Sequence, residues 1–266
     1  MQSQENGRQR QENGRLPDAA AAVLDGYGAR GFFCELTRTE GADDPAIAVL
    51  RQRFGGLSVP ALRERALNAE RDLMARGITF TVYSDATAID RILPFDLIPR
   101  VITAPEWRLI ETGVQQRVAA MNAFLHDIYH DGHILRDGVI PRERVLGNPG
   151  YSPHMVGFRV PLGTYVHICG TDIVRDRDGR FLVLEDNART PSGVAYVVEN
   201  RHMSLRLLAD MMDGLRVRSV DEYGLRLHNA LAELAPAGVT DPQVVLLSPG
   251  IFNSAYFEHV FLAREM

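Results

Sequence analysis

Three side chains that carry hard oxygen atoms, Asp172, Glu185 and Asn187, stand in two apolar-rich runs of the sequence, 164–174 and 180–187. The Asp-Gly pair between these runs is typical of a two-residue type I′ turn, so we predict an antiparallel β-hairpin. The apolar run before Glu185 is typical of a strand that is buried on both faces. A carboxylate placed there is costly unless something compensates its charge.

The predicted turn also sets the register of the hairpin. With Asp178-Gly179 as the two turn residues, Arg177 faces Arg180, and Asp172 faces Glu185. Side chains two residues apart on a strand share a face, so the asparagine that follows joins the two carboxylates.

Like charges directly opposite each other destabilise a strand pair, and three explanations remain open. The strand ends can project into solvent, one carboxyl can be protonated with a raised pKa, or a divalent cation can lie between them. Mg²⁺ accepts carboxylate and carbonyl-type oxygens and usually keeps substrate phosphates as further ligands. We therefore treat Asp172, Glu185 and Asn187 as candidate metal ligands.

The segment after the hairpin adds groups that suit an anion. Arg189 supplies a fixed cation, and residues 190–193 form a loop of small residues. The amides of Ser192 and Gly193 can approach a phosphate or an acyl group closely. The alternative is an ordinary turn before the helix predicted at 194–212.

The chain divides into four parts. Residues 1–17 contain QENGR twice and lack aromatic and β-branched residues, so we expect a disordered tail. A helical region is predicted at 18–76, and 77–240 carries the hairpin. Residues 241–266 are predicted to form one strand and one helix. The fold class that follows is α+β, with a mixed or antiparallel sheet in the part that carries the carboxylates.

Three further elements have clear boundaries in the sequence. Ser58 is an N-cap for a helix that ends at Gly77. The run 78–84 is rich in β-branched and aromatic residues and predicts a strand. Thr103 and Glu106 form a capping box at the start of the longest helix.

Composition and charge narrow the range of functions. The 266 residues carry a net charge of -5 and no basic stripe, so we expect no nucleic-acid partner. We expect no membrane partner either, since no apolar run approaches the length of a membrane span and the N-terminus has no signal-peptide core. Cys34 and Cys169 form no CxxC motif, which suits a reducing cytosol. We therefore predict a cytoplasmic protein.

The chain resembles the circularly permuted ATP-grasp proteins (type 2) that are similar to glutathionylspermidine synthase. The Asp…Glu-x-Asn arrangement resembles the metal site of ATP-grasp ligases, and LEDNxRTPSG and NSAYFEHxFLAR are the most specific motifs. The resemblance covers nearly everything after about residue 60. The matching segments are 77–85, 93–107, 115–129, 170–179, 183–201 and 246–266.

The resemblance implies an ATP-dependent carboxylate–amine ligase, in which ATP phosphorylates a carboxylate and an amine displaces the acyl phosphate. It implies that Asp172, Glu185 and Asn187 hold Mg²⁺ against the terminal phosphates of ATP. Arg189 is then the catalytic residue that contacts phosphate or acyl phosphate, and it shares the ATP site with Ser192 and Gly193. The implied substrates are a small-molecule or peptide carboxylate and an amine.

Two features depart from that pattern. Glutathionylspermidine synthetase has an Arg two residues before the metal-binding Asp, where this chain has Gly170. The permuted order also places the ATP-clamping half, with its lysines, late in the chain, whereas this sequence stops at Met266 within a predicted helix. QVVLLSPG is predicted to be the first strand of a Rossmann-like (pre-ATP-grasp) unit that has no second strand. We therefore expect an N-terminal portion whose partner is the C-terminal half of its parent chain.

That expectation has a consequence for the surface. Apolar residues near the C-terminal end should be exposed, because their sheet partners are absent. They are Val244, Val245, Leu246, Phe257, Val260 and Phe261.

Two other functions remain open on the sequence. The same carboxylates could serve a metal-dependent phosphoester hydrolase, or the chain could be a non-catalytic interaction module that keeps the fold. A ligase consumes ATP only when carboxylate and amine are both present, which separates it from a hydrolase.

Overall fold

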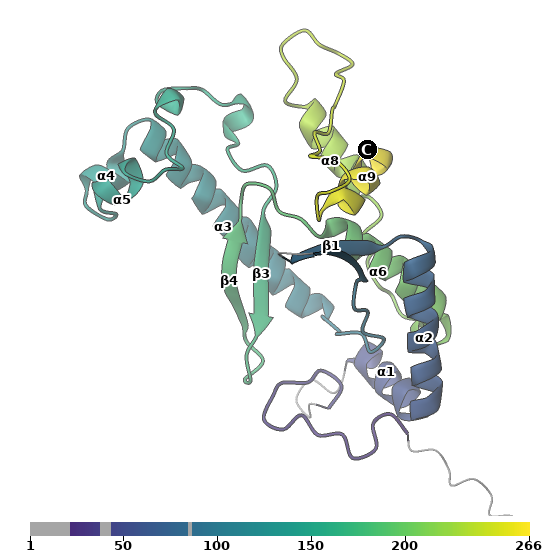
Figure 1. Ribbon diagram of the computed structural model, residues 1–266. Coiled ribbons are helices and arrows are strands. Elements are labelled where there is room, and N and C mark those ends of the chain that lie inside the picture. The colour runs from purple at the N-terminus through teal and green to yellow at the C-terminus, as the bar shows by residue number, and fades with distance from the viewer. Residues whose placement is uncertain (1–21, 38–43, 85–86) are drawn as a thin grey trace, which may run out of the picture.

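The computed structural model describes residues 22–37, 44–84 and 87–266 of the chain. Within these ranges the backbone forms helices and two separate antiparallel sheets of two strands each (Figure 1). The predicted α+β class with antiparallel strand pairing is therefore confirmed. The tail predicted at 1–17 lies outside the described residues.

Two helices open the described fold, and a polar side chain begins each of them. α1 spans Pro45–Gly55, and the Asp44 carboxylate accepts a hydrogen bond from the Ala46 amide. α2 spans Val59–Ala75 and starts, as predicted, after Ser58, whose hydroxyl accepts from an amide of the first turn. Each cap satisfies a backbone amide that has no partner inside its helix, so both starts are set locally.

The first hairpin follows α2. β1 (Thr79–Ser84) confirms the strand predicted at 78–84, and it pairs antiparallel with β2 (Thr87–Ile92). β2 was not predicted, because its sequence TAIDRI mixes β-branched residues with charged ones and leads directly into a proline-rich stretch.

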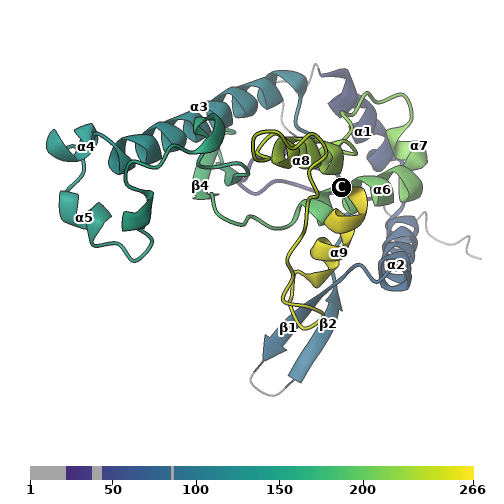
Figure 2. The same cartoon turned by 90° about the horizontal axis from the view of Figure 1, so that it is seen from above.

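The longest helix is α3 (Ala104–Tyr129), which runs through the middle part of the chain. It begins at the predicted capping box, where Glu106 accepts hydrogen bonds from the amide and the hydroxyl of Thr103 at 2.8 and 2.9 Å. Figure 2 shows that the β1–β2 hairpin points away from α3. Short elements follow α3: α4 (His133–Arg136), α5 (Arg142–Leu146) and the 3₁₀ turns Pro153–Met155 and Pro161–Gly163.

The second hairpin lies alongside α3 (Figure 1). β3 (Gly170–Arg175) and β4 (Phe181–Asn187) pair antiparallel, and Asp172 faces Glu185 as predicted. Burial on both faces of β4 is not observed. Its side chains 182–184 are between 37% and 66% exposed, so neither face of this part of the strand is buried.

The predicted two-residue turn is wrong, and so is the predicted pairing of Arg177 with Arg180. The Asp176 amide donates to the Arg180 carbonyl at 2.9 Å, which leaves three residues in the turn, with Gly179 at φ 83°. A three-residue turn that ends in a left-handed glycine is a common hairpin connection. It shifts the register by one residue, and a bulge at Leu184 shifts it back before the carboxylate pair.

The C-terminal part is mostly helical. α6 links the two ends of the described chain, since its Met203 packs with Leu73 of α2 while its Ala195 and Val198 pack with Phe261 of α9. The helices of this part are α6 (Val194–Leu207), α7 (Ala209–Met212), α8 (Tyr223–Ala232) and α9 (Tyr256–Glu265).

α9 confirms the helix predicted near Met266, but the strand predicted before it is not formed. Residues 242–250 contain neither helix nor strand, because no strand of the described chain lies beside them for pairing. The Rossmann-like unit stays a prediction.

The expected exposure of this segment is observed only in part. Val245 and Val260 are 75% and 49% exposed, and the valine and leucine on either side of Val245 are half-buried. The expectation is wrong for Phe261, which is 5% exposed, and for the half-buried Phe257 beside it. Both rings pack on the N-terminal turns of α6.

Candidate metal and nucleotide site

One face of the β3–β4 hairpin brings the three predicted metal ligands together. Asp172 pairs with Glu185 across the strands, and Asn187 lies two residues further along β4, so the three share a face. All three side chains are exposed. The Asn187 amide nitrogen donates to Glu185 Oε1 at 3.2 Å. The hairpin therefore places two carboxylates and an amide on one face, with the amide in hydrogen-bond contact with Glu185.

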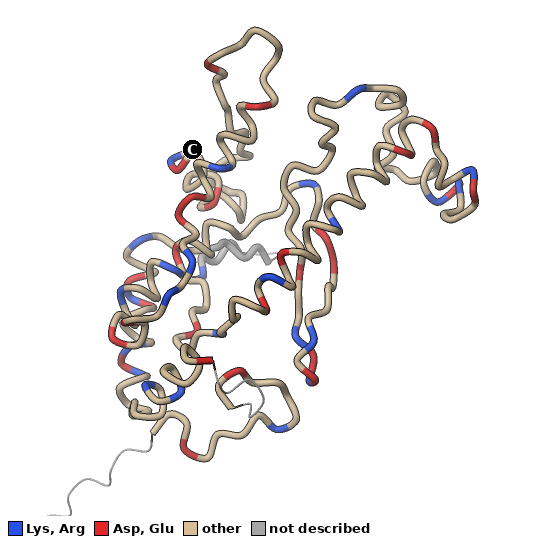
Figure 3. The backbone as a smooth tube through the Cα atoms, turned by 180° about the vertical axis from the view of Figure 1, so that it is seen from behind, with Lys and Arg blue, Asp and Glu red and all other residues tan. Residues whose placement is uncertain are grey.

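No basic group of the described chain compensates this pair. Among the described residues, no Lys, Arg or His nitrogen lies within 4.0 Å of the Asp172 or Glu185 carboxylate. In Figure 3 the turn of the hairpin carries red and blue residues together, and further red residues mark the strands beyond it. Uncompensated, facing carboxylates are the donor set that a hard divalent cation takes.

The third ligand has to come from the amide. Within the described ranges no group of three His, Cys, Asp or Glu side chains could hold a metal ion, so Asp172 and Glu185 have no further carboxylate beside them. Asn187 presents its nitrogen to Glu185, and ligation through its oxygen requires a rotation of the amide group. With that rotation, the residues present fit Mg²⁺.

The neighbouring carboxylate, Asp186, points the other way. The Arg117 guanidinium of α3 donates to both of its oxygens, and the Thr171 hydroxyl donates to Oδ1 at 2.9 Å. These hydrogen bonds hold the pKa of Asp186 below its usual value. Asp186 therefore fastens the hairpin to α3 and is not a candidate ligand.

A second set of contacts holds the turn end of the hairpin. Arg175 is 7% exposed, and it donates to Glu106 of α3 at 2.6 Å and lies 3.5 Å from Glu35. Its guanidinium also stacks over the rings of Phe33 and Phe181, at 3.8 and 4.6 Å. An isolated two-stranded hairpin is marginal in water, so these contacts keep the site in place.

The loop after β4 carries the other predicted site residues. Arg189 and Ser192 are exposed, and neither forms a hydrogen bond or ion pair with another described residue. Gly193 has φ 111°, a conformation that favours glycine. Its amide is not free for a ligand, because it donates to Glu258 Oε2 of α9 at 2.5 Å.

Gly170 stands where the similar family pattern has an arginine, and the structure gives a steric reason for the glycine. A Cβ on this residue would lie 2.8 Å from the Cβ of Pro191, which folds back over the start of β3. An arginine at this position would displace the loop. Any phosphate contact that the pattern assigns to that arginine must come from another residue here.

Sequence reasoning missed two residues that shape the site. Arg117 gives no signal in the sequence, since one arginine on an amphipathic helix resembles any other. Glu258 does give a signal. It is a carboxylate between Phe257 and Phe261, on the face of α9 that packs against the fold, and it is 4% exposed.

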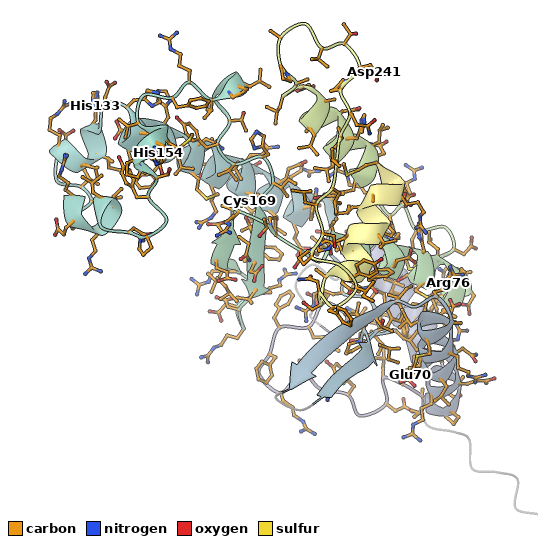
Figure 4. The ribbon with its side chains drawn as sticks, turned by 45° about the horizontal axis from the view of Figure 1, so that its top comes forward. Glu70, Arg76, His133, His154, Cys169 and Asp241 are labelled. Carbon is orange, nitrogen blue, oxygen red and sulfur yellow. The ribbon has the colours of Figure 1, made fainter. Side chains whose placement is uncertain are left out.

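Two further observations bear on the class of protein. Cys34 and Cys169 are both free. Figure 4 shows Cys169 just before the start of β3. None of the helices in the described ranges is both long and apolar enough to cross a membrane.

Comparisons with known proteins show what the chain is similar to. An uncharacterized protein of Synechocystis is 43% identical over 243 residues, which are 91% of this chain and 50% of that protein. A Mycobacterium tuberculosis protein is 47% identical over 205 residues, 77% of this chain and 36% of its own length. A Frankia alni protein with the provisional name glutamate–cysteine ligase 2-3 is 37% identical over 254 residues, 94% of this chain and 29% of its own. The chain thus spans half or less of the length of these relatives.

A family model described as a circularly permuted ATP-grasp matches residues 99–266. The matched region contains the β3–β4 hairpin, the loop after it and α9. The chain therefore belongs to the circularly permuted ATP-grasp family.

Proposed function

We propose that this chain carries the magnesium- and ATP-binding part of a carboxylate–amine ligase that works through an acyl phosphate. The observation that carries the proposal is the exposed pair Asp172 and Glu185, directly opposite each other with no cation among the described residues within 4.0 Å. Together with Asn187 these groups would hold Mg²⁺. When bound, the ion would supply positive charge that neutralises the terminal phosphates of ATP.

The proposed reaction has two steps. A carboxylate oxygen of the first substrate attacks the γ-phosphorus of ATP, and ADP leaves. The amine nitrogen then attacks the acyl carbon, loses a proton, and inorganic phosphate leaves. In this scheme Arg189 contacts the transferred phosphoryl group, and the Ser192 hydroxyl donates to a phosphate oxygen. Gly193 lets the loop turn into α6.

The substrates are proposed from the chemistry and from the relatives. The name of the Frankia alni relative joins two amino acids, which supports an amino-acid or peptide carboxylate and an amine. The 266-residue sequence contains no lysine, so each of its Lys/Arg cations is an arginine. We propose that the lysines that clamp ATP belong to the C-terminal half of the parent chain. The two free cysteines support a cytoplasmic location.

The first test removes one ligand charge in the natural full-length protein. Glu185→Gln should abolish amide formation and weaken Mg²⁺ binding at least tenfold, because it leaves one carboxylate to hold the ion. The fold should stay intact, since the side chain is exposed. Asp178→Asn is the matched control: it removes a carboxylate at the turn end of the same hairpin and should behave as wild type. Wild-type ligation in Glu185→Gln would overturn the metal assignment.

Product analysis separates the ligase from the two rival functions. A ligase forms ADP, phosphate and an amide only when carboxylate and amine are both supplied. A phosphoester hydrolase releases phosphate without an amine. An interaction module leaves ATP unchanged under every condition.

A further inference from the structure

We infer that Glu258 is a positioning residue for the loop 188–193, an inference that rests on the proposed function. The loop leaves the end of β4 and enters α6 at Gly193. The path of the loop therefore sets the positions of Arg189 and Ser192 relative to the hairpin face that carries the candidate metal ligands. Glu258, on α9, holds the point at which the loop becomes helix.

Burial makes a purely structural reading of Glu258 difficult. The residue is 4% exposed, and among the described residues no Lys, Arg or His nitrogen lies within 4.0 Å of its carboxylate. A buried charge without an ionic partner is costly, and an apolar side chain would pack there at lower cost. The hydrogen bond that the carboxylate accepts from the Gly193 amide offsets part of this cost.

That bond is suited to fixing the loop. The Gly193 amide donates to Glu258 Oε2 at 2.5 Å, and a hydrogen bond to an ionised acceptor is stronger than one between neutral groups. The carboxylate also lies at the N-terminus of α6, where the helix dipole favours a negative charge. Phe257 and Phe261, on either side of Glu258 in α9, pack against the start of α6, and the low polarity of this region strengthens the bond further.

A second contact restrains the same loop from the opposite side. Pro191 lies over Gly170 so closely that a Cβ there would be 2.8 Å from the proline Cβ. The loop is thus held by β3 at Pro191 and by α9 at Gly193. Ser192 lies between these two restraints, and Arg189 lies between Pro191 and the end of β4. Groups held on both sides in this way keep the geometry that a phosphate contact needs.

The arrangement also decides which groups are left to meet a phosphate. Glu258 occupies the Gly193 amide, and its negative charge lies at the start of α6. Phosphate contacts therefore come from Arg189 and Ser192, while Gly193 contributes its left-handed backbone conformation.

The test uses Glu258→Gln in the natural full-length protein. The glutamine keeps the shape and one acceptor oxygen but removes the charge. The Gly193 amide should exchange with solvent faster, and calorimetry should give about tenfold weaker binding of Mg-ATP. Binding of Mg²⁺ alone should stay the same, because the ligands on the hairpin are untouched. Glu265→Gln on the same helix is the matched control and should bind both as wild type does.

Gly170→Ala moves the loop from its other side and should weaken Mg-ATP binding with Mg²⁺ binding retained. This variant decides the question if Glu258→Gln does not fold. If the wild-type protein binds Mg-ATP and the folded variants bind it with the same affinity, the positioning role is overturned and the proposed function is not. A wild-type protein that binds no Mg-ATP overturns the proposed function itself.

Discussion

Glu106 shows how single residues hold the candidate site without belonging to it. Its carboxylate closes the first turn of α3 through Thr103 and receives Arg175 from the hairpin at 2.6 Å. Burial opposes the charged form, but the hydrogen bonds from Thr103 and Arg175 outweigh it and lower the pKa of Glu106 from 4.5 to about 2. One carboxylate therefore links the helix start to the sheet that carries the candidate metal ligands.

A pH-dependent loss of stability follows from this shift. Because the pKa of Glu106 is lower in the folded state, its contribution is complete above about pH 4.5 and disappears as the pH falls towards 2. We expect Glu106→Gln to reduce the fall in the free energy of unfolding across this interval by about 1–2 kcal/mol. Urea denaturation at a series of pH values measures the free energy of unfolding across this interval. Glu64→Gln, at an exposed position of α2, is the control, and an equally steep profile in Glu106→Gln would contradict the assignment.

At the scale of elements, the hairpin depends on a glycine at its turn. Gly179 has φ 83°, and a Cβ there would lie 2.6 Å from Cε2 of Phe33, the ring that also stacks on Arg175. The turn thus packs directly on the N-terminal segment. A side chain at this position meets both backbone strain and a collision.

Two glycine substitutions separate these effects. Gly138 also has a positive φ, 70°, but a Cβ there meets nothing within 4 Å. Gly138→Ala should cost about 1–2 kcal/mol from backbone strain alone. Gly179→Ala should cost about 1–3 kcal/mol more, because it also displaces the Phe33 ring. Denaturation midpoints measure both, and equal losses would show that the turn does not press on the ring.

On the scale of the whole molecule, several apolar side chains near the end of the chain are exposed. Val245, Leu247 and Phe252 are 75%, 91% and 80% exposed, and they lie close together in sequence before α9. Exposed apolar groups that cluster in this way favour association.

Leu247→Gln should reduce concentration-dependent self-association of the 266-residue chain and leave its melting temperature unchanged, because the side chain makes little contact. Sedimentation velocity over a range of concentrations measures the association. Leu109→Gln, at a 66% exposed position on α3, is the control and should not alter it. Association that is equal in both variants would show that the segment before α9 is not responsible.

The 266-residue chain should form no amide when supplied with Mg²⁺, ATP, a carboxylate and an amine. ATP-grasp catalysis depends on holding the nucleotide between two halves, so that the phosphates meet both the metal ions and fixed cations. In the proposed function this chain supplies the acidic ligands, and two carboxylates alone repel a phosphate. Calorimetry measures nucleotide binding, and product analysis measures amide formation. Tight nucleotide binding together with turnover would contradict the proposal that catalysis needs both halves.

The sequence by itself determined the features that depend on neighbouring residues. The N-cap at Ser58 and the capping box at Thr103 act within one helical turn, so they are readable locally. The pairing of Asp172 with Glu185 was also predicted, although the turn was not: a three-residue turn and a bulge at Leu184 shift the register in opposite directions and cancel. A residue pattern of period two cannot reveal such a compensation.

Tertiary structure alone decided the contacts between residues far apart in the chain. It turned Asp186 towards Arg117, brought Pro191 over Gly170, and placed the buried Glu258 of α9 at the start of α6. Each contact depends on how separate elements pack, and packing is set by the whole set of side chains rather than by a local pattern. For this reason the sequence identified the ligand candidates, and only the fold revealed what holds the loop beside them.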